Sequence, residues 1–403
     1  MIGRWLLPEG VDRVVLPLLV GKALRAFADG YVAVLLPAYL LALGFGTLAV
    51  GILSTATLLG SALATLAVGA WGYRFHQRHL LLGAALLMLG TGLSFAYLSA
   101  FWPLLLVAFA GTLNPSSGDV SVFLPLEHAR LADSCQGAAR TSLFARYSLL
   151  GALFAALGAL ASGAPQFLVS ALGFAQLDAF RVMFLLYALV GGVVWLLYHR
   201  LPMPAPEAKA LAPQPLRESK PIVLRLALLF SVDAFAGGLA INALMMLWFL
   251  QRFDLSLAAA GRFFFWAGLL SAVSQLLAPK VAQRIGLVNT MVFTHIPASV
   301  CLIVAAFVPN VELALALLFV RALLSQMDVP VRSAFVMEVV SPSERAAAAS
   351  FTAVPRSLAS AISPTLGGAM FAAGCLAAPL VACGVLKIAY DLALWRAFRQ
   401  HRL

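Results

Sequence analysis

HRLPMPAPEAKALAPQPLRESK, from His199 to Lys220, is the longest polar stretch of a chain that otherwise consists of long apolar runs. Proline, alanine and charged residues dominate it, a composition typical of an extended connection rather than a packed element. The stretch divides the sequence into two parts of similar length. We interpret residues 1–198 and 221–403 as two domains and residues 199–220 as the linker between them.

The overall composition indicates a protein embedded in a lipid bilayer. Of its 403 residues, 62% are hydrophobic and 11% are charged, whereas soluble domains carry roughly 25% charged residues. A helix that crosses the hydrocarbon core needs about 20 consecutive, mostly apolar residues. Length and composition therefore predict an all-α membrane protein. The first apolar run continues to about Leu43, so we expect a retained helix there rather than a cleaved leader.

Twelve transmembrane helices are predicted from apolar runs that end at glycine, proline or charged residues. Six lie on each side of the linker, which predicts two pseudo-symmetric six-helix bundles. The predicted spans are 15–43, 47–70, 80–99, 102–126, 141–163 and 180–198 in the first half, and 222–250, 256–279, 288–307, 312–337, 347–372 and 375–396 in the second.

The formal net charge of +11 is explained by where the basic residues lie. They fall mostly at alternate ends of the apolar runs, as expected when Lys and Arg hold short loops on the cytoplasmic side. This pattern predicts a multi-pass protein of the cell inner membrane with both termini in the cytoplasm. The basic residues form no continuous stripe, so we expect no nucleic-acid partner.

Short motifs recur in the same order in the two halves. They are AFADG at 26–30 with AFAGG at 234–238, DVSV at 119–122 with DVPV at 328–331, and RYSL at 146–149 with RSL at 356–358. Because six is an even number, duplication of a six-helix unit preserves its orientation in the membrane. Two such parallel-related bundles are expected to enclose a path along the membrane normal.

With this topology and repeat, the chain resembles the major facilitator superfamily of secondary transporters over nearly all of its length. Members carry a G-x-x-x-D-R-x-G-R-R signature between helices two and three. Here that stretch reads GAWGYRFHQR at residues 69–78 and keeps Gly69, Arg74 and Arg78. Tyr73 stands at the acidic position, so the charge pairing that the family makes at this loop is not implied here.

A weaker copy of the signature, PKVAQRIGLV at 279–288, keeps Arg284 and Gly286 between helices eight and nine. The resemblance implies two bundles that expose a central solute site alternately to the two sides of the membrane. The family has a basic residue in helix four. Arg321 is its counterpart on helix ten in the second half.

Charged side chains inside predicted spans are candidates for function, because each costs at least about 2.5–3.5 kcal/mol on insertion scales. Arg25 and Asp29 lie four residues apart on the first helix, within pairing reach, and Asp233 aligns with Arg25 in the repeat. One interpretation is an ion pair that exchanges partners between two states and so changes its proton affinity. The other is a static pair that fixes helix packing.

Arg321 and Arg356 complete the predicted substrate or proton pathway. The planar guanidinium of Arg356 could hold an anionic group, or it could pair with Asp328. We also expect Lys387 and Asp391, four residues apart on the last helix, to form a local pair. His295 is alone in its predicted span.

An inner gate is predicted near the cytoplasmic ends of the helices. It comprises Arg74, Asp119, Arg146, Asp328 and Arg332. Asp328 and Arg332 are four residues apart, so a local salt bridge and a contact between the halves are both open. The segment NPSSGD at 114–119 is predicted to interrupt the fourth helix, either as a packing kink or as polar lining of a cavity.

These features predict a secondary active transporter that moves a small-molecule solute by alternating access, with a proton as the coupling ion. The excess of positive charge within the spans favours an anionic solute. The alternative is a non-transporting sensor or lipid-modifying factor of the same fold. No P-loop is present and no cysteine or histidine spacing suggests a metal site, so we expect neither an enzyme nor a cofactor. A monomer is expected.

Overall fold

The computed structural model is mostly helical in the residues that it describes. These are Leu7, Val11, residues 13–116, 121–134, 137–202, Arg217, residues 219–341 and 344–398. Within them, ten helical segments are long and apolar enough to cross a membrane. In hydrocarbon, backbone N–H and C=O groups must be satisfied within the segment itself, so apolar runs of this length fold as helices. The predicted all-α membrane protein is confirmed, and the count of twelve spans stays a prediction.

The chain forms two compact units. The first comprises Met1–Pro206 with Leu255–Phe265, and the second comprises Glu207–Asp254 with Trp266–Leu403. The segment from Leu255 belongs with the first unit because the start of its helix contacts that unit. There the hydroxyl of Ser162 donates to the carbonyl of Leu257 at 3.4 Å, and Ala258 N–H donates to Gln166 at 3.2 Å.

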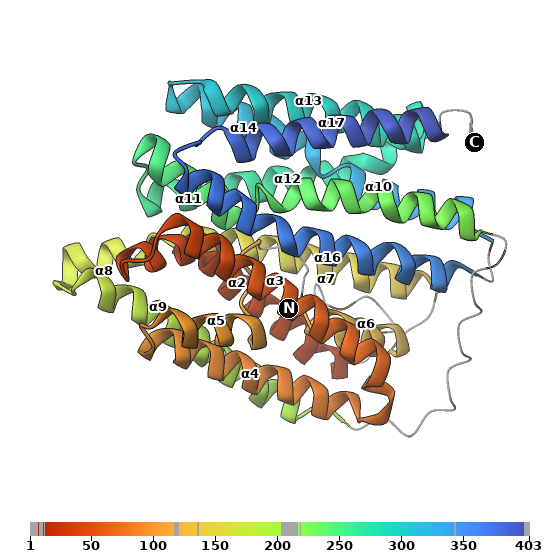
Figure 1. Ribbon diagram of the computed structural model, residues 1–403. Coiled ribbons are helices and arrows are strands. Elements are labelled where there is room, and N and C mark those ends of the chain that lie inside the picture. Colours follow the sequence, from red (N-terminus) through yellow and green to blue (C-terminus); the bar gives the residue numbers. More distant parts are fainter. Residues whose placement is uncertain are drawn as a thin grey trace. The chain divides into compact units, whose positions relative to one another are not determined.

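Within the described residues, ten helical elements precede the linker. They run from red to yellow-green in Figure 1, where α4 lies alongside α9. They are η1 (Arg13–Val15), α2 (Leu16–Ala42), α3 (Thr47–Trp71), η2 (Gly72–Arg74), α4 (Gln77–Tyr97), α5 (Phe101–Ala110), α6 (Phe123–Asp133), α7 (Gly137–Ala161), α8 (Ala164–Leu172) and α9 (Gln176–His199).

The described part of the chain after the linker contains eight helices. Among them α13 lies alongside α17 (Figure 1). They are α10 (Lys220–Gly238), α11 (Asn242–Phe253), α12 (Leu257–Ile285), α13 (Leu287–Phe307), α14 (Val311–Ser325), α15 (Asp328–Val339), α16 (Arg345–Ala372) and α17 (Ala378–Phe398). Gly286 has φ of +87° between α12 and α13, a conformation that favours glycine, so the glycine of the second signature copy makes the turn between them.

The sequence repeat corresponds to the same helix contact in both units. In the first unit α2 packs along α7, and in the second α10 packs along α16. A Cβ atom on Gly30 would lie 2.1 Å from the carbonyl oxygen of Ala155, and one on Gly238 would lie 2.5 Å from that of Ser360. Gly30 and Gly238 end the motifs AFADG and AFAGG, so each motif ends where two backbones approach closely.

The fourth predicted span is interrupted, as its sequence predicted. α5 ends at Ala110 and α6 begins at Phe123. In the break, the buried Asn114 accepts hydrogen bonds from the backbone N–H and the hydroxyl of Ser116, at 3.1 and 2.7 Å. Local bonds of this kind compete with helical hydrogen bonding. Asp119 lies outside the described residues.

Two further spans that were predicted as single helices are each divided. α10 ends at Gly238 and α11 begins at Asn242. The break between them directly follows the glycine pair at 237–238, and glycine disfavours helix. α14 ends at Ser325 and α15 begins at Asp328. Pro330 lies in the first turn of α15, where its missing N–H costs no hydrogen bond. The break before α11 lies in the apolar residues 239–241, so the hydropathy pattern did not reveal it. The break before α15 carries Gln326, Asp328 and Pro330, a polar signal that the prediction of a single helix passed over.

Candidate functional site

Two clusters of buried polar side chains stand out, one in each unit. The first, the Glu127 cluster, consists of Arg25, Glu127, Tyr147 and Tyr198. The second, the Asp233 cluster, consists of Asp233, His295, Asp328, Arg332, Lys387 and Asp391.

The Glu127 carboxylate ties four helices of the first unit together. Arg25 on α2 donates to its Oε1 at 2.5 Å. The hydroxyls of Tyr198 on α9 and Tyr147 on α7 donate to Oε1 and Oε2, respectively. Glu127 is fully buried on α6, and the guanidinium of Arg25 also lies 4.0 Å from the ring centroid of Phe123. Both carboxylate oxygens are bonded, which a buried charge requires.

Sequence reasoning missed Glu127. Spacing placed Asp29 within pairing reach of Arg25, but the observed salt bridge of Arg25 is with Glu127. The predicted fourth span ended one residue before this glutamate, so Glu127 was not counted among the charges at membrane depth. Asp29 lines a small cavity beside the cluster together with Lys22 and Arg25.

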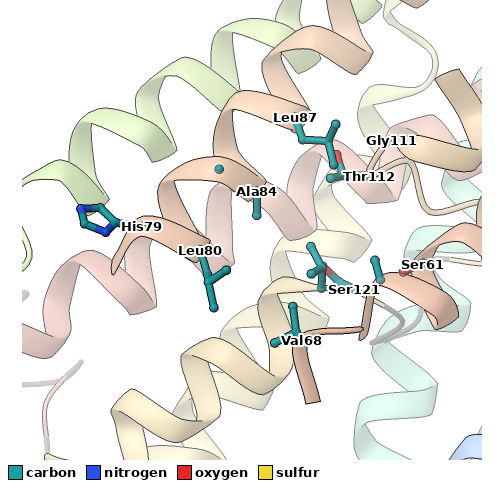
Figure 2. Close-up of a pocket in the computed structure, with 12 residues that line it drawn as sticks. Ser61, Val68, His79, Leu80, Ala84, Leu87, Gly111, Thr112 and Ser121 are labelled. Atoms are coloured by element: carbon teal, nitrogen blue, oxygen red, sulfur yellow. The ribbon is translucent and has the colours of Figure 1, made fainter. Parts of the chain in front are cut away.

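A larger cavity of about 240 Å³ lies in the first unit between α3, α4 and the break that follows α5 (Figure 2). Its wall is mostly apolar, and Figure 2 shows His79 at the opposite end from Ser61, Thr112 and Ser121. Ser121 also lines the small cavity beside Arg25. Thr112 and Ser121, which flank NPSSGD, thus contribute polar lining to the larger cavity. Asn114, within NPSSGD, is buried.

The Asp233 carboxylate lies between two cations of the second unit. Its Oδ1 accepts a hydrogen bond from Lys387 on α17 at 2.6 Å, and its Oδ2 accepts one from Arg332 on α15 at 3.0 Å. Arg332 also donates to Asp328 at 2.6 Å. Asp233, on α10, is 3% exposed. Three helices therefore meet in an ion-pair network that is shielded from water.

His295 on α13 extends this network to a second carboxylate. Its Nδ1 lies 3.1 Å from Oδ1 of Asp391, and its Nε2 lies 3.3 Å from Nζ of Lys387 and 4.0 Å from Oδ1 of Asp233. Asp391 is fully buried, and its Oδ2 has no hydrogen-bond partner in the described part of the chain. His295 is the one acidic, basic or histidine residue of α13, as predicted, but α17 and α10 bring charged partners to it.

The predicted pairings in this region are partly confirmed. The salt bridge between Asp328 and Arg332 is present. The alternative pairing of Asp328 with Arg356 is not observed, because Arg332 holds that carboxylate. The predicted local pair of Lys387 and Asp391 is wrong. Lys387 donates to Asp233 on α10 and Asp391 contacts His295 on α13, because these two neighbouring helices bring a partner within hydrogen-bond distance of each side chain.

Three candidate arginines form no salt bridge within the described residues. Arg146 on α7 and Arg356 on α16 occupy repeat-related helices, and Arg321 lies on α14. One terminal nitrogen of Arg146 is buried without a hydrogen-bond partner, whereas Arg356 is exposed. Arg74, the remaining gate candidate, is exposed in η2.

The signature stretch contacts the end of α9, where Arg78 donates to the carbonyl of His199. Arg130 on α6 donates to the carbonyl of Pro202, just beyond that helix, at 2.6 Å. The last carbonyls of a helix lack intrahelical partners and carry partial negative charge, so arginine side chains stabilise them. With tyrosine at the acidic signature position, Arg78 thus binds main-chain oxygen.

The profile of the Major Facilitator Superfamily matches residues 18–325. This chain belongs to the Major Facilitator Superfamily. The membrane protein YJR124C of Saccharomyces cerevisiae, described as uncharacterized, is 25% identical to this facilitator over 407 residues, covering 92% of this chain and 91% of the yeast protein.

Solved transporter structures share the fold of this facilitator. A bacterial homologue of the human lysosomal transporter Spinster matches with a TM-score of 0.73 at 16% identity, covering 97% of this chain and 98% of that one. The nucleoside transporter NupG gives 0.73 at 15%, covering 96% and 100%. A D-xylose-proton symporter gives 0.72 at 14%, covering 95% and 97%. The expected facilitator fold is confirmed.

Proposed function

We propose that this facilitator is a proton-coupled secondary transporter that moves a small anionic solute across the inner membrane by alternating access. Residues 1–198 and 221–403 act as the two six-helix halves, and the linker 199–220 and both termini lie in the cytoplasm. The placement of Lys and Arg at alternate ends of the apolar runs supports this orientation.

The Asp233 cluster is the observation that carries the proposal. It holds three carboxylates, two cations and a histidine on lipid-embedded helices. A buried ion pair can often be replaced by apolar side chains without loss of stability, so packing alone gives little reason to keep such a network. Ionisable groups at this depth are typical of proton pathways in transporters. Family membership and this cluster together favour coupling to a proton gradient.

The arginines without salt bridges support an anionic solute. Three arginines add positive charge to the spans, namely Arg146, Arg321 and Arg356. The carboxylates in the observed salt bridges are already paired with other cations. Arginine presents a planar set of donors that matches carboxylate and phosphate groups. Arg356 forms no salt bridge within the described residues, so an anionic solute could pair with it without displacing a carboxylate.

Flux into liposomes tests this proposal. Purified protein is reconstituted, a pH gradient is imposed, and uptake of radiolabelled succinate, benzoate and glycerol phosphate is compared with that of xylose and uridine. We expect gradient-driven accumulation of at least one anion and none of the neutral solutes. Accumulation that ignores the gradient would contradict proton coupling. Absence of flux for every solute, with a monodisperse protein, would favour the non-transporting sensor.

A further inference from the structure

His295 bridges a cation and a carboxylate in the Asp233 cluster. Nε2 of its ring lies 3.3 Å from Nζ of Lys387, and Nδ1 lies 3.1 Å from Oδ1 of Asp391. An ammonium group has donors and no acceptor, so Nε2 must accept the hydrogen bond from Lys387. Nδ1 then carries the ring proton and donates it to Asp391. The contacts therefore assign a neutral histidine in the Nδ1–H tautomer.

The directly bonded groups of the cluster are one proton short of neutrality. Asp233, Asp328 and Asp391 supply three negative charges, and Arg332 and Lys387 supply two positive charges. With a neutral histidine the sum is one negative charge. Uncompensated charge is costly away from water, so one added proton stabilises the group.

Other ionisable side chains face this region from the packed helices. Arg356 on α16 lies within electrostatic range of Asp233 and Asp328, and Arg321 on α14 lies within electrostatic range of Cys383 on α17. The carboxylates form their salt bridges with Arg332, Lys387 and His295. The ring of Tyr390 meets that of His295 edge-on at 6.3 Å, and its buried hydroxyl has no hydrogen-bond partner in the described residues. None of these groups bonds Asp391.

Asp391 is the carboxylate best suited to take the missing proton. Asp233 accepts hydrogen bonds from two cations, and Asp328 accepts one from Arg332. Asp391 has a single bond, from a neutral ring, and a buried Oδ2 without a partner. An anion with fewer and weaker donors is less stable than its protonated form.

Side-chain exposure defines a direction toward Asp391. Lys387 is 13% exposed, His295 is 3% exposed and Asp391 is fully buried. The lysine is therefore the group in this series that water can reach most easily. The histidine separates it from the buried acid.

We propose, building on the proposed function, that Asp391 carries the coupled proton and that Lys387 and His295 deliver it. Lys387 passes a proton from Nζ to Nε2 of His295, and the ring releases its Nδ1 proton to Oδ1 of Asp391. Lys387 then takes a replacement proton from hydronium in the aqueous phase. The sum of these steps moves one proton from the aqueous phase to Asp391 and leaves the neutral histidine with its proton on Nε2. Return of the proton from Asp391 by the same route restores the Nδ1–H tautomer. Asp233 stays ionised between its two cations.

Infrared difference spectroscopy on the reconstituted full-length protein, without any solute, tests this assignment. As the pH is lowered, the wild type is expected to gain the C=O band of one protonated carboxylic acid. Asp391→Asn should lose this band, and Asp391→Glu should keep it at a shifted frequency. Asp178→Asn, which alters an exposed salt bridge, is the control and should keep the band unchanged. A band that persists in Asp391→Asn and disappears in Asp233→Asn would overturn the assignment.

The delivery route is tested by the rate at which the band forms after a rapid pH drop. His295→Gln keeps a polar side chain but cannot exchange protons at two ring nitrogens, so we expect band formation at least tenfold slower than in the wild type. A wild-type rate in a correctly folded His295→Gln protein would refute the relay. The infrared measurement contains no solute, so its result does not depend on transport. A protonation band that is lost in Asp391→Asn, together with no flux in the liposome assay, would refute only the proposed function. Gradient-driven flux, together with a band that persists in Asp391→Asn, would refute only this inference.

Discussion

Replacement of Glu127 by Gln is expected to destabilise the first unit strongly. The substitution keeps the size of the side chain and removes its charge. Arg25 then remains buried, at 4% exposure, without its counter-charge. The hydroxyls of Tyr147 and Tyr198 lose a charged acceptor in the same step. Four helices are joined at this carboxylate, so the loss affects the packing of all of them.

The size of the effect follows from burial. Breaking a buried ion pair by removing one partner costs about 3–5 kcal/mol, because an uncompensated charge stays behind. An exposed pair contributes about 0.2–1 kcal/mol. The pair of Arg181 and Asp178, with side chains 35% and 55% exposed, is a matched exposed pair in the same unit. Asp178→Asn should therefore change the free energy of unfolding by less than about 1 kcal/mol.

Equilibrium unfolding in detergent micelles, followed by circular dichroism, measures these differences. The double variant Arg25→Met with Glu127→Gln removes both charges, so its cost should fall well below the sum of the two single costs, by about 2 kcal/mol or more. The reasoning is refuted if Glu127→Gln is as mild as Asp178→Asn, or if the two single effects simply add.

Gly30→Val and Gly238→Val should each lower stability by about 1–3 kcal/mol or more, because the new side chain meets backbone atoms of the facing helix. Gly90→Ala, which meets no atom within 4 Å, should leave the unfolding midpoint unchanged or raise it slightly in the same titration. Arg356→Gln should weaken the apparent affinity for a transported anion at least tenfold in the liposome assay. Arg262→Gln, which replaces an exposed arginine of α12, should leave that affinity unchanged. An equal loss of affinity in both variants would argue against an anion site at Arg356.

Much of the fold could be predicted from the sequence, because lipid imposes simple rules. Apolar runs of sufficient length must form helices, and the polar stretch from His199 separates the two sets. The repeated motifs were also informative, since Gly30 and Gly238 mark the same close contact in the two units. Breaks within spans were harder to find. NPSSGD gave a local signal, whereas the break after Gly238 lies in the apolar residues 239–241.

The candidate site could be predicted only where its partners share a helix. The salt bridge between Asp328 and Arg332 follows from their spacing and is present. The partners of Arg25 and His295 come from other helices, so no spacing rule could identify them. Glu127 lay just beyond a predicted span and was overlooked. These contacts depend on which helices pack together. A single sequence does not specify that packing.

Proton movement driven by solute tests the central claim most directly. Proteoliposomes loaded with a fluorescent pH indicator, and with no imposed gradient, receive an anion that the flux assay identified as transported. Wild type and Asp178→Asn are predicted to change the internal pH as the anion enters, and Asp391→Asn is predicted to show no such change. Anion entry without any pH change in the wild type, or the same change in Asp391→Asn, would contradict a proton-coupled mechanism centred on this cluster.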